Sequence, residues 1–349
     1  EPQQVHNQQV LGALPISPHV LQILFRLSGP RTWIFASTSF ILGYVLSGGT
    51  ALFAICIGVA IACLVTAATN IVNAYADRKE DAVNQPARAF WLDQVGDGGV
   101  RATAIFCYCS ALALSVFLSP LFVAILLLGI FNSVFYSAHP LRFKTHPFTA
   151  LFSFSAALAL PFLGGVSINQ TPTLWNPMLW LVTYFMFTYG TVKNLPDFAG
   201  DKKAGVKTSA TIFKNIGDAV AFTGILLFTP YILLVSLVGV GLLNPIYLVS
   251  LAMLPMLAFV FQRMRGARNS EQLEHAHTLG YFYAISFVLV TLILSTTTMT
   301  AVAVVAVAYV WALLVSRSRL HSRVEKRDWE NQTHTTRTHP VHDHKVRGS

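Results

Sequence analysis

The chain has 349 residues, of which 54% are hydrophobic and only 11% are charged. Soluble domains usually carry about 25% charged residues, and a soluble fold this poor in charge would expose large apolar patches. The composition therefore excludes a two-domain soluble enzyme and predicts a polytopic membrane protein. The net charge of +9 does not indicate a nucleic-acid partner, because the basic residues recur in short blocks between apolar runs.

Ten apolar runs that are long enough to cross a lipid bilayer follow one another along most of the chain. Tight turns separate several of them, such as Gly48-Gly49, Ser119-Pro120 and Asn244-Pro245. The sequence therefore predicts an all-α integral membrane protein with nine core helices and a tenth helix after them. The runs lie at about 32–48, 50–74, 101–118, 120–137, 148–168, 174–194, 218–240, 244–262, 279–295 and 299–316.

The chain divides into four parts on this basis. Residues 1–24 form a polar tail that we expect to be weakly structured, and residues 25–298 form the transmembrane core. Residues 299–316 supply the additional transmembrane helix. Residues 317–349 form a basic, His-rich tail whose composition predicts disorder.

The charges follow a strict alternation along the chain. The connections near residues 48, 119, 170, 242 and 298 contain no Lys, Arg, Asp or Glu. All 24 basic and all 15 acidic residues therefore fall on one face of the membrane. Because loops rich in Lys and Arg stay on the cytoplasmic side, we expect this face, including the basic tail, to be cytoplasmic.

Acidic residues end the second apolar run. Asn73, Asp77 and Asp81 are spaced four residues apart, so on a continuing helix they would form one stripe. Like charges at this spacing destabilise a helix modestly. A divalent cation between the carboxylates would remove that repulsion.

A second acidic segment ends the sixth run. Its polar side chains again recur at every fourth position, at Tyr189, Lys193, Asp197 and Asp201, although Pro196 is expected to kink the helix. Oxygen-only clusters suit hard cations, and Mg²⁺ is held by a few carboxylates together with phosphate oxygens of a substrate. One such pair of acids is usually a solvated helix end, but two on the same face, each flanked by basic residues, favour a functional site.

A third segment, Tyr136 to Lys144, leaves the fourth run on the same face. Arg142 can bind a phosphate group through two parallel hydrogen bonds, and Lys144 can bind it as a point charge. Taken alone, these two residues would more often be ordinary cytoplasmic anchors.

Together, the three segments resemble the UbiA superfamily of intramembrane prenyltransferases, which also contains membrane terpene cyclases. That family carries an Asn-Asp-x-x-Asp-x-x-x-Asp motif after its second helix, an Asp-x-x-x-Asp motif after its sixth, and a Tyr-Ser-x-Pro-Pro-x-Arg-x-Lys-like stretch between them. The matching stretches here are Asn73 to Arg88, Lys193 to Thr208 and Tyr136 to Lys144. The similarity covers roughly residues 25–295.

This resemblance implies a nine-helix bundle around a central cavity, in which two Mg²⁺ ions and several cations hold a prenyl diphosphate. The isoprenyl group would pass to a lipophilic acceptor, with an aromatic acceptor favoured. The implied metal ligands are Asn73, Asp77, Asp81, Asp197 and Asp201, and the four acids together with Lys193 form the implied catalytic set. The implied diphosphate contacts are Asn73, Arg88, Tyr136, Arg142, Lys144, Tyr189 and Lys202.

The chain also departs from the family pattern. Ala74 and Ala199 stand where acidic residues are usual, and His139 replaces the first of two paired prolines. These departures keep open a terpene cyclase that ionises the diphosphate without an acceptor. A secondary transporter is a third possibility, but such proteins usually place ionisable residues near the middle of the bilayer.

Overall fold

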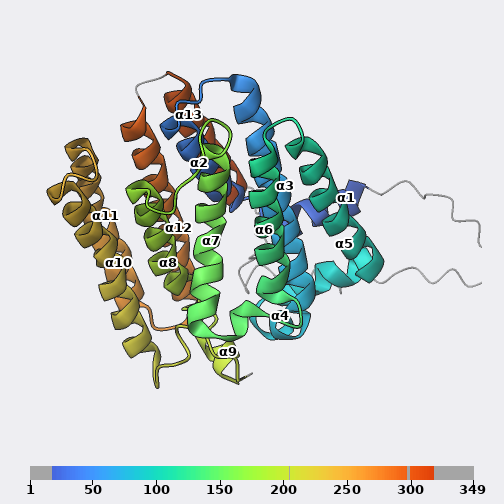
Figure 1. Cartoon of the computed structure of the whole chain (residues 1–349). Helices are drawn as coiled ribbons and strands as arrows, with labels where there is room; N and C mark the ends of the chain where they lie inside the picture. Colours follow the sequence, from blue (N-terminus) through green and yellow to red (C-terminus); the bar gives the residue numbers. More distant parts are fainter. Residues whose placement is uncertain (1–17, 204, 297–298, 318–349) are drawn as a thin grey trace, which may run out of the picture.

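The computed structural model of the protein describes residues 18–203, 205–296 and 299–317, and these residues form helices and turns without any strand. The predicted all-α membrane bundle is confirmed (Figure 1). Residues 1–17 of the first predicted tail and 318–349 of the second lie outside the described residues. The long elements are α2 (Trp33–Leu46), α3 (Leu52–Ala76), α5 (Pro86–Ser115), α6 (Pro120–Ser137), α7 (Pro147–Val166), α8 (Pro177–Lys193), α10 (Ile216–Gly239), α11 (Leu254–Gly266), α12 (Ser270–Ser295) and α13 (Met299–Arg317).

Each of the ten predicted runs corresponds to one of these helices. Eight stretches of the described chain are long and apolar enough to cross a membrane, where the 3₁₀ helix η2 (Pro245–Met253) and α11 count as one. The remaining two, α2 and α8, have only 14 and 17 residues. Most side chains of both helices are buried. Helices α2 and α8 therefore occupy central positions in the bundle.

Several helix starts are encoded by a capping side chain followed by proline. Ser119 Oγ accepts a hydrogen bond from the Phe122 amide at 3.0 Å, and Asn176 Oδ1 accepts one from the Met178 amide at 2.9 Å. The next residue in each case is a proline, which costs nothing in the first turn of a helix because its missing N–H would be unpaired there. The turn predicted at Ser119-Pro120 is therefore a helix N-terminus.

The N-terminal boundary of the core was predicted too late in the chain. Residues Pro18–Leu27 form the helix α1, although 18–24 were assigned to the polar tail. Ile23 and Leu27 of α1 are buried in a small apolar cluster together with Trp91 of α5. The apolar residues of this short segment are enough to dock it on α3 and α5, so the structured part begins earlier.

The polar stretch between the second and third predicted runs is helical as well. It forms α4 (Arg78–Asn84) and the first part of α5, and α5 is interrupted at Gly96, whose φ of 74° lies in the left-handed region that favours glycine. We expected a connecting segment here because so charged a stretch cannot span a membrane. A charged stretch can still form a helix outside the bilayer, and this one does.

The connections alternate between the two ends of the bundle. Helix α4, the 3₁₀ helix η1 (Phe143–Thr145) and helix α9 (Phe198–Lys203) lie together at one end, at the bottom of Figure 1. The connections at the other end, such as 47–51 and 167–176, contain no charged residue. We refer to the first end as the charged end.

Helices α2 and α7 pack against each other at very short range. A Cβ atom added to Gly165 of α7 would lie 2.2 Å from the Phe40 carbonyl oxygen, and one added to Gly43 of α2 would lie 2.1 Å from the Phe162 carbonyl oxygen. Small residues at such crossings let helix backbones touch, which is a main source of association between helices in lipid. The contact fixes two walls of the cavity described below.

We expect Gly165→Ala to destabilise the protein by about 1–3 kcal/mol, because the new methyl group must push two backbones apart. Thermal unfolding in detergent measures the effect. Gly239→Ala is the matched control, since a Cβ at Gly239 meets nothing within 4 Å. Equal melting temperatures for the two variants would contradict the proposed role of this crossing.

Candidate active site

A single cavity of about 830 Å³ opens at the charged end and runs into the bundle between α2, α3, α6, α7 and α8. Eleven of the twelve predicted site residues line it, which brings together three segments that are far apart in the sequence. Those eleven are Asn73, Asp77, Asp81, Arg88, Tyr136, Arg142, Lys144, Tyr189, Lys193, Asp197 and Asp201.

The cavity changes from charged to apolar along its length. Gly58 and Asp77 both line it, Gly58 from within α3 and Asp77 from the position directly after that helix. At a rise of 1.5 Å per helical residue, they lie about 28 Å apart. Its inner part is bounded mainly by aliphatic and aromatic side chains: Phe35, Phe40, Ile61, Phe122, Ile125, Leu126, Phe154 and Leu160. A molecule with a charged group and a long hydrocarbon chain matches this profile.

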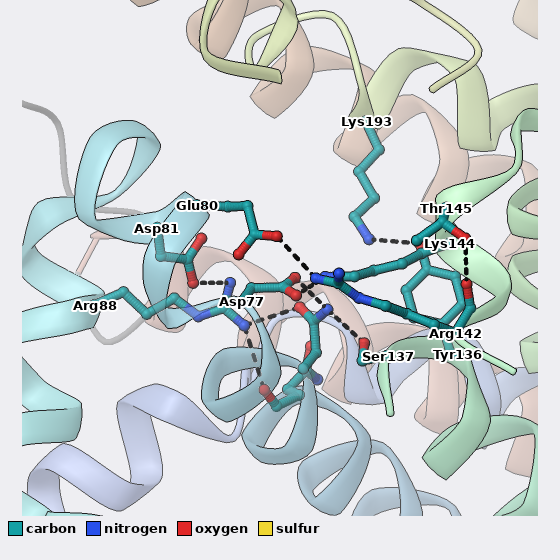
Figure 2. A network of polar contacts seen from close by, with 12 residues as sticks. Asp77, Glu80, Asp81, Arg88, Tyr136, Ser137, Arg142, Lys144, Thr145 and Lys193 are labelled. Atoms are coloured by element: carbon teal, nitrogen blue, oxygen red, sulfur yellow. Dashed lines mark hydrogen bonds and ion pairs between the residues drawn. The ribbon is translucent and has the colours of Figure 1, made fainter. Parts of the chain in front are cut away.

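Asp77 lies at the centre of a polar network near the mouth (Figure 2). Its carboxylate accepts a hydrogen bond from Asn73 Nδ2 at 2.8 Å and forms an ion pair with Lys144 of η1. The Asn73 amide also donates to Ser137 Oγ of α6 at 2.9 Å. The network thus joins α3, α6 and η1 around one carboxylate.

The first acidic stripe was expected on one continuing helix, but the structure divides it between two helices. Helix α3 ends at Ala76, and a new helix, α4, begins at Arg78, with Asp77 at the junction. The Asp77 amide still donates to the Asn73 carbonyl at 3.0 Å, and the Asp81 amide to the Asp77 carbonyl at 2.7 Å. The four-residue spacing therefore survives the break and keeps these side chains on one side.

Asp81 and Arg88 form a buried pair beside this network. Arg88 Nη1 lies 3.0 Å from Asp81 Oδ2, and Arg88 Nη2 donates to Asn73 Oδ1 at 2.9 Å. Only 4% of Asp81 and 6% of Arg88 is exposed to solvent. In this structure the guanidinium group of Arg88, which was predicted to contact a diphosphate, is bound to the acidic motif.

Arg142 and Lys144 reach the mouth from the connection between α6 and α7. Arg142 has a φ of 39°, a left-handed conformation that non-glycine residues rarely adopt, and its guanidinium group pairs with Glu80 at 2.8 Å. The pKa of Lys144 is lowered to about 7, mainly by burial and in part by the nearby Lys193, while Asp201 opposes this shift. This arrangement concentrates basic groups beside the acidic ones.

Lys193 is the last residue of α8 and points into the same space (Figure 2). Its Nζ lies 3.5 Å from the Tyr136 hydroxyl and 5.3 Å from the ring centres of both Tyr136 and Phe154. Lys193 forms no ion pair with any other residue that the structure describes. Its ammonium group is therefore able to accept an anionic ligand.

The second acidic stripe is also divided between two helices. Helix α8 ends at Lys193, Pro196 lies in the following turn, and α9 begins at Phe198. Asp197 and Asp201 flank the start of α9 and both line the cavity. Proline lacks an amide hydrogen and its ring obstructs a continuing helix, so the predicted kink is a complete break.

Of the twelve predicted site residues, Lys202 is the one that does not line the cavity. Its side chain is exposed, and its Nζ donates to the carbonyl groups of Phe213 at 3.3 Å and of Lys214. Lys202 neighbours Asp201, but successive side chains of a helix do not face the same way. The spacing of the motif could not separate it from the lysines that line the cavity.

The donors at the mouth suit Mg²⁺ by their chemistry. They are carboxylate oxygens of Asp77, Asp81, Asp197 and Asp201 and an amide oxygen of Asn73. Within the described ranges, no three Asp, Glu, His or Cys side chains converge closely enough to hold a metal ion by themselves. Mg²⁺ commonly completes its coordination with substrate phosphates and water, so the residues fit an ion that arrives with a phosphate group.

Other cavity residues were not identified from the sequence. Lys207 and Thr208 belong to the second motif, and Glu80 belongs to the first, so closer attention to the motifs could have found them. Arg31 and Tyr281 also line the cavity, from the start of α2 and from α12. No motif marks either residue.

Comparisons with known proteins identify the family of this chain. The model of the UbiA prenyltransferase family matches residues 32–277. The chain is 29% identical over 188 residues to the digeranylgeranylglyceryl phosphate synthase of Methanoregula boonei, covering 53% of this chain and 66% of that one. It is also 29% identical over 217 residues to the lycopene elongase/hydratase of Haloarcula japonica, covering 59% and 71%.

A solved structure of a UbiA homologue from Archaeoglobus fulgidus, bound to DMAPP and Mg²⁺, has the same fold. Its TM-score is 0.52 at 18% sequence identity, and the match covers 76% of this chain and 99% of that one. The resemblance predicted from the motifs is confirmed by the family match, which spans well over half of the sequence. The chain belongs to the UbiA prenyltransferase family.

Proposed function

We propose that the protein transfers an isoprenyl group from a prenyl diphosphate to a lipophilic acceptor, with Mg²⁺ as its cofactor. The observation that carries this proposal is one cavity, about 28 Å long from Gly58 to Asp77, with acids and lysines at its mouth and an apolar inner part. The diphosphate would bind at the mouth and the hydrocarbon chain would lie along the interior. Support also comes from the Archaeoglobus fulgidus homologue, whose structure contains DMAPP and Mg²⁺.

Asn73, Asp77, Asp81, Asp197 and Asp201 would hold Mg²⁺. When bound, Mg²⁺ would offset the negative charge that develops on the departing diphosphate. Lys193, Lys144 and Arg142 would contact the diphosphate directly, which requires Lys144 to leave Asp77 and Arg142 to leave Glu80. Anionic ligands can replace these carboxylates because the same hydrogen-bond donors serve both partners.

In the reaction, the C–O bond between the prenyl group and the diphosphate breaks, and its electron pair leaves with the diphosphate. The allylic carbon then bonds to the acceptor, which loses a proton to solvent or to a base. Tyr136 and Tyr189 line the cavity, and their rings can stabilise a positively charged allylic group. The apolar lining keeps water away from that group.

We infer that the charged end faces the cytoplasm. The connections at the opposite end contain no Lys or Arg, and such connections are the ones that cross the membrane during insertion. The preference for an aromatic acceptor stays a prediction.

Asp77→Asn and Asp197→Asn should each abolish turnover of geranylgeranyl diphosphate in the purified full chain, because each removes a carboxylate from the mouth. Excess chelator should abolish turnover of the wild type, and added Mg²⁺ should restore it. Asp97→Asn is the matched control, since Asp97 pairs with Arg78 at the surface and does not line the cavity. Full activity of either cavity variant would contradict the proposal.

Two lysines of the second motif, Lys193 and Lys202, allow a second test. Lys193→Met should lower kcat/KM for the prenyl diphosphate about 10- to 100-fold, which corresponds to one lost charged hydrogen bond of about 1.5–3 kcal/mol. Lys202→Met should change it less than threefold, because Lys202 binds backbone carbonyls outside the cavity. Steady-state kinetics on both variants decide the matter, and a larger loss in Lys202→Met would refute this assignment.

Incubation with radiolabelled geranylgeranyl diphosphate and no acceptor separates a transferase from a terpene cyclase. A transferase should leave most of the diphosphate unreacted until an acceptor is added. Accumulation of a cyclised hydrocarbon or alcohol without acceptor, detected by mass spectrometry, would identify a cyclase instead.

A further inference from the structure

Arg31 is a buried cation on the wall of the cavity. It lies in the turn between α1 and α2, is 8% exposed, and lines the cavity. Its Nη2 atom is buried and has no hydrogen-bond partner, and Arg31 forms no ion pair with any part of the chain that the structure describes. A buried charged donor in this state is costly, and native structures rarely retain one without a reason.

The side chain is held in place by contacts that leave its Nη2 atom without a hydrogen-bond partner. The guanidinium group stacks on the ring of Tyr281 with its Cζ 4.2 Å from the ring centre. The Tyr281 hydroxyl donates to the Arg31 backbone carbonyl at 2.6 Å, which ties α12 to the start of α2. Stacking on an aromatic face leaves the edge of a guanidinium group, where its N–H donors lie, open to a ligand.

Arg88 provides the contrast within the same cavity. It is buried to a similar extent, but Asp81 and Asn73 accept its hydrogen bonds. The fold therefore supplies acceptors where an arginine has a structural task. Among the residues that the structure describes, no carboxylate pairs with Arg31, and this difference favours a partner that is a bound ligand.

Arg31 is also separated from the predicted diphosphate contacts. The cations proposed to contact the diphosphate directly, Lys193, Lys144 and Arg142, lie at the end of α8 and in the connection between α6 and α7, whereas Arg31 lies in the turn before α2 and Tyr281 in α12. Between the two lies Phe35, whose ring centre is 5.8 Å from that of Tyr281 and 6.0 Å from that of Tyr189. The cavity thus has one cationic region at its mouth and a second, single cation on another wall.

We propose that Arg31 binds an anionic oxygen group, a carboxylate or a phosphate, carried by the acceptor. Two parallel N–H donors of one guanidinium group match the two oxygens of either group. Arg31 would then determine specificity, since it would select an acceptor with an anionic head and orient its reactive atom toward the prenyl carbon. This inference rests on the proposed function, because a transferase needs a second substrate in the same cavity.

The test uses Arg31→Gln and Arg31→Lys in the purified full chain, with geranylgeranyl diphosphate and Mg²⁺ at saturation. Two acceptor pairs differ only in the anionic group: geranylgeranylglyceryl phosphate with geranylgeranylglycerol, and a hydroxybenzoate with the matching hydroxybenzyl alcohol. The first pair tests a phosphate and the second a carboxylate. Arg26→Gln is the matched control, because Arg26 lies five residues earlier, stacks on Trp91 and does not line the cavity.

The wild type should prefer the anionic member of one pair. Arg31→Gln should raise KM for that acceptor about 10- to 100-fold and leave KM for the diphosphate within twofold. Arg31→Lys, which keeps the charge but loses the two parallel donors, should give an intermediate KM. Arg26→Gln should behave like the wild type. Arg31→Lys also keeps the test decisive if Arg31→Gln does not fold.

Calorimetric binding of each acceptor in the absence of diphosphate gives a readout that does not depend on turnover. Weaker binding of the anionic acceptor to Arg31→Gln supports the assignment even if the wild type makes no product, a result that would refute only the transferase proposal. The assignment is overturned if the charged and uncharged acceptors bind equally well. It is equally overturned if Arg31→Gln raises KM for the diphosphate and not for the acceptor.

Discussion

The cost of placing a charge in hydrocarbon shapes this whole molecule. Because the bilayer excludes ionised side chains, the charged residues that the structure describes lie in or beside the connections at one end. Helices of alternating direction then bring every charged connection to that same end, although the connections are far apart in the sequence (Figure 1). The confinement that keeps the protein in the membrane also collects the groups from which its site is built.

Crowding so many charges at one end is tolerable only when they neutralise each other. Lys144 pairs with Asp77, Arg142 with Glu80 and Arg88 with Asp81, so each acid of the first motif has a basic partner from another segment. These partners differ in depth, since Arg88 is buried while Arg142 and Lys144 sit at the cavity mouth. The deep pair is suited to hold the motif in shape, and the outer pairs are suited to exchange partners.

The sequence was sufficient for the helices and for most of the site, because both depend on local signals. Apolar runs, capping residues and the acidic spacings are all readable without tertiary structure, and they predicted eleven of the twelve residues correctly as neighbours of one cavity. The breaks at Asp77 and after Lys193 were missed because the four-residue spacing is the same across a tight junction. Lys202 and Arg31 could not be placed, since only packing decides which of several lysines and arginines turns inward.

Arg31 and Asp77 show two ways in which a cavity can be prepared for an anionic or cationic ligand. Asp77 is neutralised by Lys144 until a ligand arrives, so binding exchanges one ion pair for others and the net cost of desolvation is small. Arg31 has no such partner in the described chain and is held by an aromatic ring alone, so it bears the cost of an unpaired donor in the empty cavity. A ligand that satisfies Arg31 recovers that cost directly. A matching anion therefore gains more binding free energy from an unpaired donor than from the exchangeable ion pairs. An acceptor without an anionic group binds more weakly, because it leaves that donor unpaired.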